Sequence, residues 1–469
     1  MAQSAIKRRR DFTSGPLLPQ IFGFAIPLML SSILQHTFNT ADTLMVGRWG
    51  GITPDACENA LAAVGSTSSL ISLLTDFFIG LSVGVSVCVG FNVGAKRYDM
   101  VKKTMHTAAT VSFITGAIIV VLGCLLARPA LIWMGTEPAV LDEAVPYVMA
   151  YMCGMPAMVF YSYCSAGLRA TGDTVRPLIF LTAGGVANVV LNAVMTMGFH
   201  AGALGVGVAT AVSQWVSCIM LIIYLRRSDG LCRLEFRSLG IDKEVLKKMV
   251  TVGIPVGIEN SLFSISNVLI TSSVNSFGKV VVAGNAVAKS IDHYMDVPSG
   301  AFAQAAITSV SQNHGAKQYP RVKRCVLTCV ICMLCINVPL ITAVMLLGKP
   351  ILALYTPGNQ PVMDAAFVRL SIMATTYFLA GCMNIMANTV RGLGRSLSAT
   401  ICSLVGTCGF RILWIYLVVE RFHYLWVLYI SYPISWALMA VLFGFMAFRT
   451  IRKREREMQC ALADATSTQ

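Results

Sequence analysis

The sequence predicts an all-α integral membrane protein with twelve transmembrane helices in two parallel six-helix repeats. The chain of 469 residues is 56% hydrophobic but only 12% charged, against about 25% charged residues in a soluble globular protein. Its mean hydropathy is +0.69, and apolar runs of about 20 residues, the length that spans a bilayer as a helix, recur along it. An internal repeat indicates the two halves.

Twelve apolar runs are expected to cross the membrane, and short connectors separate them. Lys7 to Arg10 precede a first run that is too long for a signal peptide and lacks a small-residue cleavage site, so we expect this run to be a span. No stretch has the composition of a separate soluble domain. The predicted spans are 18–46, 60–92, 104–127, 144–168, 177–199, 203–225, 250–276, 283–312, 325–347, 364–390, 397–419 and 425–448.

The longest connector divides the chain. We expect an N-terminal six-helix bundle in residues 1–226 and a basic cytoplasmic linker in residues 227–248. A C-terminal six-helix bundle should follow in residues 249–448, with a cytoplasmic tail in residues 449–469. Four cysteines at helical spacing in one span could resemble a metal-cluster motif, but Cys in an apolar helix usually packs as a small hydrophobe. They are Cys325, Cys329, Cys332 and Cys335.

The placement of lysine and arginine indicates the orientation of the spans. Of the 36 basic residues, 28 lie at the termini and in connectors on one side, and five lie on the other. The remaining three, Lys289, Arg369 and Arg411, fall in or beside spans. Because basic residues are retained in the cytoplasm, we predict a multi-pass protein of the cytoplasmic membrane with both termini cytoplasmic. The same distribution explains the net charge of +14 without nucleic acid as a partner.

The internal repeat joins corresponding segments of the two halves. The connector GAKRYDMVKK, which begins at Gly94, matches GAKQYPRVKR, which begins at Gly315, at an offset of 221 residues. The turns after Arg169 and Arg391 match at an offset of 222, and Pro27 matches Pro255 at 228. Six spans are an even number, so the halves are parallel repeats. Transporters built this way bind substrate between the halves and expose it alternately to each side.

The repeated connector, the Arg-x-x-Gly turns after the fourth and tenth spans, and the stretch NTADTLMVG resemble the MATE family (multidrug and toxic compound extrusion). The connector does not match the Gly-x-x-x-Asp-Arg-x-Gly signature of the major facilitator superfamily, which shares the twelve-helix architecture. The resemblance implies two six-helix bundles around a V-shaped cleft. It also implies a cation-coupled multidrug antiporter that exports organic cations in exchange for protons or sodium.

Asp42 is the first candidate site residue, because a carboxylate inside a span costs about 2.5–3.5 kcal/mol on insertion scales and is a functional hypothesis by default. It can bind a proton, or a hard cation when ionised. Asn39 lies beside it in the same polar cluster. The alternative is an acid at the mouth of the protein that stays solvated.

Three further polar residues match the first-half cation site of the family that the chain resembles. Asn188 and Asn192 are four residues apart and share one helix face, and Thr210 lies in the next span. With Asp42 they would supply oxygen ligands for Na⁺, or hydrogen bonds around a protonated Asp42. The alternative is that the two amides only join helices to one another.

The second half offers further acids. Glu259 resembles the acid of the NorM branch, but the acid that this branch carries in the tenth span is replaced by Ala380, which puts a complete NorM-type site in doubt. The eighth span carries Asp292 and Asp296, with Lys289 and His293 as supporting polar residues. The spacing of Lys289 and Asp292 allows a neutralising pair on one face.

We expect no catalysis and no cofactor beyond the coupling ion, H⁺ or Na⁺. The sequence contains no HExxH or GxSxG motif and no aspartyl pair on facing helices. The expected partners are small organic cations and the lipid bilayer, and we expect a monomer. A related flippase for a lipid-linked polyanion is the alternative within transport. It would require basic residues along the cleft, where only Lys289, Arg369 and Arg411 are available.

Overall fold

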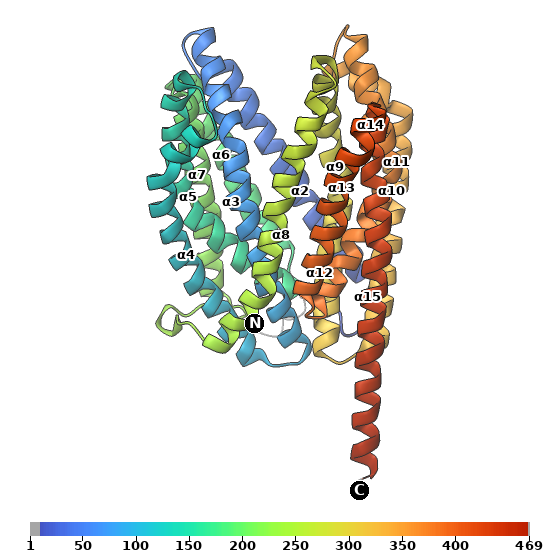
Figure 1. The fold of residues 1–469 in the computed structure, drawn as a ribbon. Helices are drawn as coiled ribbons and strands as arrows, with labels where there is room; N and C mark the ends of the chain where they lie inside the picture. The colour runs from blue at the N-terminus through green and yellow to red at the C-terminus, as the bar shows by residue number, and fades with distance from the viewer. Residues whose placement is uncertain (1–9, 468–469) are drawn as a thin grey trace. The chain divides into compact units, whose positions relative to one another are not determined.

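The computed structural model describes residues 10–467, with side chains to residue 460 except those of Leu269 and Leu354. Almost all of this chain is helical (Figure 1). The helices are α2 (Leu17–Trp49), α3 (Pro54–Gly94), α4 (Tyr98–Trp133), α5 (Pro138–Ala170), α6 (Val175–Ala193), α7 (Gly202–Arg227), α8 (Lys243–Asn275), α9 (Lys279–Gly315), α10 (Tyr319–Tyr355), α11 (Gln360–Gly392), α12 (Ser396–Ser403), α13 (Phe410–Trp414), α14 (Glu420–Phe422) and α15 (Leu425–Ser467).

Short irregular helical turns complete the chain. A π-helical turn, η1 (Val194–Gly198), continues α6, and two more, η3 (Leu404–Gly409) and η4 (Ile415–Val419), flank α13. A 3₁₀ turn, η2 (Phe236–Ser238), lies between α7 and α8. Because π turns inside helices are frequent at functional sites, those in α6 and around α13 mark two regions of interest.

The prediction of an all-α membrane protein is confirmed. Within the described residues, eleven helices are long and apolar enough to cross a membrane. Helix α9 has 37 residues and covers the eighth predicted span, 283–312, but falls outside that set. Its N-terminal half carries Lys289, Asp292 and Asp296, so its composition is less apolar than that of the other long helices.

The internal repeat is visible in the backbone. Lys96 and Lys317 occupy equivalent places in the repeated connector, and both have a φ of 56°. Gly172 and Gly394, which end the equivalent Arg-x-x-Gly turns, have φ values of 89° and 81°. Left-handed φ values are uncommon for a residue with a side chain. Their recurrence at matched positions therefore supports the repeat inferred from the sequence.

The helices form two compact units. Among the described residues, unit 1 comprises residue 10, Leu30–Val89 and Arg97–Gly257, and unit 2 comprises Asp11–Met29, Gly90–Lys96 and residues 258–467. The units therefore do not follow the two sequence halves everywhere, because α2, α3 and α8 each contribute residues to both. Figure 1 shows α15 extending at its C-terminal end past α10 and α11, its neighbours in unit 2.

Within unit 1, α3 and α8 approach each other closely through glycines. A Cβ atom on Gly80 would lie 2.5 Å from Cα of Gly257, and one on Gly84 would lie 2.1 Å from the carbonyl oxygen of Met249. Gly80 and Gly84 are spaced as in GxxxG, and so are Gly253 and Gly257. Small residues at this spacing allow membrane helices to pack backbone to backbone.

Replacing Gly84 with alanine should destabilise the protein by about 1–3 kcal/mol, the usual cost of overpacking. Gly65→Ala is the matched control, because Gly65 lies in the same helix and a Cβ atom added there would meet no neighbouring residue within 4 Å. Thermal unfolding in detergent should therefore separate the two variants. Equal unfolding temperatures would contradict the close packing of α3 and α8.

The connector between α7 and α8 packs on the start of α4 in unit 1. The backbone N–H of Glu235 donates to Nε2 of His106 at 3.1 Å, and that of Asp242 donates to Oγ1 of Thr107 at 3.2 Å. The ammonium of Lys102 lies 3.0 Å from Oε1 of Glu235 and lowers the pKa of that carboxyl. These contacts hold the basic linker in a defined position.

In unit 2, the segment before α2 is fixed by side chains from α9 and α10. Gln312 and Asn313 bind the backbone N–H and C=O of Phe12 at 3.0 and 3.1 Å. Arg321 donates to the carbonyl oxygens of Phe12 and Gly15 at 2.8 and 2.7 Å. Buried backbone groups need such partners, and here the repeated connector region supplies them.

Candidate functional site

Asp42 lies at the centre of a polar cluster in unit 1. Nδ2 of Asn192 on α6 donates to Oδ1 of Asp42 on α2. Asn188, one turn earlier on α6, donates to Oδ1 and Oδ2 of Asp42 at 2.8 and 3.1 Å when its amide nitrogen faces the carboxylate. The amide group of Asn188 also lies 3.4 Å from Oγ1 of Thr210 on α7. The structure thus brings together all four residues that the sequence places in one site.

The cluster sits where α6 changes geometry. Asn188 and Asn192 are buried and Asp42 is half-buried. Turn η1 begins two residues after Asn192, and Oγ1 of Thr196 in this turn donates to the carbonyl oxygen of Asn192 at 2.7 Å. The side chain of Asn39, which was expected to support Asp42, is exposed, and no hydrogen bond between the two is found in the described chain.

One acceptor in this cluster lacks a partner. Oδ1 of Asn192 is fully buried and accepts no hydrogen bond from the described residues. Leaving a buried polar group unpaired costs about 1–3 kcal/mol. Rotation of the Asn192 side-chain amide by 180° would exchange its two ends, so that Oδ1 instead of Nδ2 faces Asp42. That second arrangement suits a protonated Asp42, which donates a hydrogen bond, or a cation that lies between the two oxygens.

Glu259 on α8 occupies a different environment, in unit 2. It is 2% exposed, and its Oε1 accepts from Nη2 of Arg391 at 2.6 Å. Its Oε2 accepts from Oγ1 of Thr400 at 2.8 Å. Both carboxylate oxygens are therefore occupied by protein donors. A buried carboxylate held in this way neutralises Arg391, the arginine of the repeated turn.

The spacing of Lys289 and Asp292 in the sequence allowed these two residues to pair, but in the structure the partner of Asp292 is Arg369. Both Nε and Nη2 of Arg369 on α11 donate to Oδ2 of Asp292 on α9, at 3.0 and 2.7 Å. Nη1 of Arg369 donates to Oδ1 of Asn285 at 2.8 Å. Arg369 presents several donors in a fixed planar fork, so the neighbouring helix provides a better partner for Asp292 than a lysine on its own helix.

The other polar residues of α9 gather at a small cavity within unit 2, of about 170 Å³. Lys289, Asp292, His293 and Asp296 all line it, together with Arg369. The side chains of Lys289 and Asp296 are exposed, and no hydrogen bond or ion pair joins either of them to another described residue. Aromatic side chains from α11 and α15 complete the wall, namely those of Tyr377, Tyr432 and Trp436.

Sequence reasoning missed the role of two arginines. The sequence placed Arg369 and Arg411 in or beside spans and named them as cleft residues only for the flippase alternative, yet both are buried, at 6% and 5% exposed. Their guanidinium carbons lie 5.9 and 4.1 Å from the ring centre of Tyr432. A buried ionisable residue in a membrane segment is itself a signal of function, and this rule identifies both arginines from their place in the spans.

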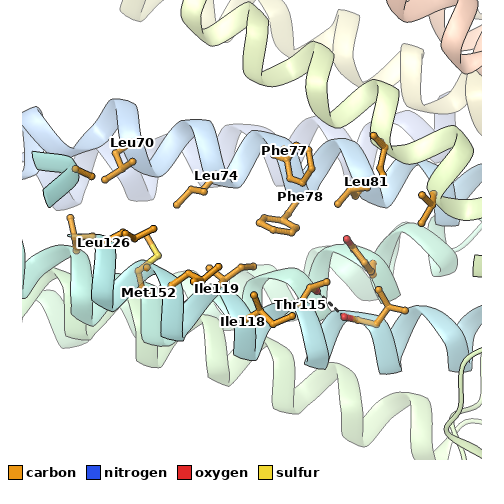
Figure 2. A pocket seen from close by; sticks show the side chains of 18 of the residues that line it. Leu70, Leu74, Phe77, Phe78, Leu81, Thr115, Ile118, Ile119, Leu126 and Met152 are labelled. Carbon is orange, nitrogen blue, oxygen red and sulfur yellow. Dashed lines mark hydrogen bonds between the residues drawn. The ribbon is translucent and has the colours of Figure 1, made fainter. Parts of the chain in front are cut away.

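Unit 1 also contains an apolar cavity of about 680 Å³ (Figure 2). Figure 2 shows Leu74 and Phe78 of α3 across from Ile118 and Ile119 of α4. None of the described residues that line the cavity is charged. Its volume lies within the range of about 300–1,000 Å³ typical of sites for drug-sized ligands, and its walls suit the apolar part of such a ligand.

Comparison with known families identifies the chain. The model of the MatE family matches residues 27–194 and 255–417, more than half of the sequence. The chain belongs to the MATE family. One matched stretch falls in each sequence half, as the internal repeat of a MATE protein requires. MATE proteins are membrane transporters, and the chain is a multi-pass membrane protein of this kind.

Two relatives and one solved structure illustrate the family likeness. The probable multidrug resistance protein YoeA of Bacillus subtilis (strain 168) is 28% identical over 435 residues, 91% of this MATE chain and 92% of that protein. An FAD transporter of Shewanella oneidensis is 23% identical over 405 residues, 85% and 87% of the two chains. An outward-facing multidrug resistance MATE transporter of known structure covers 95% of this chain and 98% of its own, with a TM-score of 0.86 and 20% identity. This last likeness shows the MATE fold.

Proposed function

We propose that the protein is an antiporter that exports amphipathic organic cations from the cytoplasm, driven by inward flow of H⁺ or Na⁺ through the Asp42 cluster. The orientation proposed is the one that the basic residues predict, with both termini cytoplasmic. The name of the Bacillus subtilis relative supports multidrug export as the activity.

The observation that carries the coupling proposal is the unpaired Oδ1 of Asn192 beside the Asp42 carboxylate. In the geometry described above, two amide nitrogens stabilise an ionised Asp42. When a proton or Na⁺ binds Asp42, the amide oxygens of Asn188 and Asn192 become the better neighbours, because they accept hydrogen bonds and coordinate cations. The site then has two arrangements that differ by one bound cation.

The apolar cavity of unit 1 supports the proposed substrate class. It can bury the apolar part of a drug but offers no counterion, so the charged group of the substrate must bind elsewhere. The substrate and the coupling cation compete for acidic groups, so binding of one displaces the other. This competition exchanges the substrate for the coupling cation. The two relatives, a probable multidrug resistance protein and an FAD transporter, do not favour a flippase for a lipid-linked polyanion.

Efflux of ethidium from proteoliposomes tests this function. A pH gradient and a Na⁺ gradient should be imposed separately, with the protein absent from control liposomes. We expect one of the two gradients to drive ethidium movement above the control, since Asp42 can accept either ion. Ethidium movement at the control rate under both gradients would contradict cation-coupled export.

A further inference from the structure

The C-terminal part of α15, which extends past its neighbours in unit 2 (Figure 1), is held against α10 by one face. Ile451 is buried in the same apolar cluster as Val322 and Val326 of α10. Four residues further along α15, Oε2 of Glu455 accepts from Nζ of Lys323 on α10 at 2.8 Å. These contacts fix the rotation of α15 about its own axis, and so determine which of its side chains face outward.

The opposite face of α15 presents one continuous line of exposed side chains. Its members recur every three or four residues, which places them on one side of a helix, and the helix period turns them away from Ile451. They are Leu438, Leu442, Phe445, Arg449, Arg452 and Arg456. The line is apolar before residue 449 and cationic from there on. We call its three basic members the arginine line.

The apolar part of this face is deep enough for one leaflet of a bilayer. Arg449 follows Leu438 by 11 residues, which is about 16 Å along a helix. The hydrocarbon core of a bilayer is about 30 Å thick, so one leaflet supplies about half of that depth. When the acyl chains of a lipid lie against Leu438 to Phe445, its phosphate lies level with Arg449 and Arg452.

The arginine line has no counterion in the protein. No ion pair joins its members to another residue in the described part of the chain, although two acids follow in the same helix. The carboxylate of Glu457 lies 3.9 Å from Nζ of Lys453 and 3.0 Å from Nη1 of Arg454. Glu455 is paired with Lys323. The acids of this helix therefore neutralise basic residues outside the arginine line and leave the line positive.

Arg449 lies at the boundary between the apolar and the cationic part of the face. Its guanidinium carbon lies over the ring of Phe445, 4.5 Å from the ring centre. This contact leaves its N–H groups available for phosphate oxygens, because a guanidinium donates in its own plane. Arginine commonly binds phosphate through two such parallel bonds. Arg452 is a neighbour of Arg449 on the helix surface and can donate to the same phosphate.

We propose that this face of α15 binds an anionic phospholipid of the adjacent leaflet. The acyl chains lie along Leu438, Leu442 and Phe445, and the phosphate accepts from Arg449 and Arg452. A zwitterionic headgroup would bring an ammonium beside three arginines that have no counterion, whereas phosphatidylglycerol adds no positive charge. The inference goes beyond the proposed export function and does not depend on it.

Native mass spectrometry of the full chain, released from detergent micelles, tests the proposal. Dioleoyl phosphatidylglycerol and dioleoyl phosphatidylethanolamine share their acyl chains and differ in net charge, and each is titrated separately. We expect phosphatidylglycerol to bind at least about tenfold more tightly, and to stay bound in an equal concentration of inorganic phosphate. Equal dissociation constants for the two lipids, or displacement by free phosphate, would overturn the proposal.

Replacing the whole arginine line locates the binding. Arg449→Gln, Arg452→Gln and Arg456→Gln in one chain should weaken phosphatidylglycerol binding at least about tenfold, since each basic residue near an anionic surface contributes about fivefold, or about 1 kcal/mol. Binding of phosphatidylethanolamine should stay the same. All three side chains are exposed, so the variant should fold, which thermal unfolding checks. Undiminished binding of phosphatidylglycerol by the folded variant would place the lipid elsewhere and overturn the site.

Lys323→Gln, Lys453→Gln and Arg454→Gln in one chain form the matched control. This variant loses the same number of positive charges from the same region of α10 and α15, outside the arginine line. Its affinity for phosphatidylglycerol should stay within about twofold of that of the unmodified protein, because water and salt screen charges that do not contact the phosphate. An equal loss in both triple variants would mean that overall charge alone attracts the lipid. A doubled mass without bound lipid would instead mean that a second copy of the chain covers this face, and either result would overturn the proposal.

Discussion

Asp42→Asn should reduce gradient-driven ethidium transport in proteoliposomes to the rate of protein-free liposomes. The asparagine side chain has nearly the same size as aspartate but cannot take up a proton or carry the charge that binds Na⁺. Asn188 and Asn192 would then face a neutral amide in every state of the cycle. Coupling between cation and substrate is lost, whichever cation the protein uses.

The fold should survive this change. Removing a partly buried charge relieves a desolvation cost, so the free energy of unfolding should stay the same or rise. Asp142→Asn is the matched control, because Asp142 is an exposed residue on α5 in the same unit. It should transport ethidium like the unmodified protein. Undiminished transport by a well-folded Asp42→Asn protein would exclude Asp42 as the coupling residue.

Glu259→Ala should destabilise the protein by about 3–5 kcal/mol, the usual cost of removing one partner of a buried ion pair. The change leaves the guanidinium of Arg391 without its carboxylate. Nε of Arg391 is already buried and unpaired, so little compensation is available. Denaturant or thermal unfolding in detergent micelles measures the effect.

A double-mutant cycle separates structure from function at this position. Glu259→Leu combined with Arg391→Leu should recover much of the loss, because replacing both members of a buried pair by apolar residues is often nearly neutral. Glu259→Gln should cost less than Glu259→Ala, since it retains an oxygen for Thr400. Normal stability of Glu259→Ala with loss of transport would instead assign this acid to the transport cycle.

The sequence predicted the fold class, the twelve helical segments and the composition of the Asp42 cluster. Hydropathy is a local property, so spans can be read from the chain. Asn188 and Asn192 could be placed on one face from their spacing, while their meeting with Asp42 and Thr210 was implied by the family resemblance. The geometry of these four residues agrees with that implication, and their role in coupling stays a prediction.

The polar contacts of unit 2 could not be predicted in the same way. Spacing along a helix shows which residues are neighbours on that helix, and this favoured Lys289 as the partner of Asp292. The actual partner, Arg369, is 77 residues away, and Arg391 is 132 residues from Glu259. Such pairs depend on which helices pack together and at what height, which hydropathy does not encode.

The way in which α2 and α8 are shared between the two units bears on how the transporter could move. Residue assignment changes from unit 2 to unit 1 after Met29 in α2, and from unit 1 to unit 2 after Gly257 in α8. Pro27 and Pro255 each lie two residues before the change. A proline has no N–H to donate to the preceding turn. A bend at either proline would therefore cost one backbone hydrogen bond fewer than a bend elsewhere in the same helix, and the repeat has placed this weaker point at matching positions of α2 and α8.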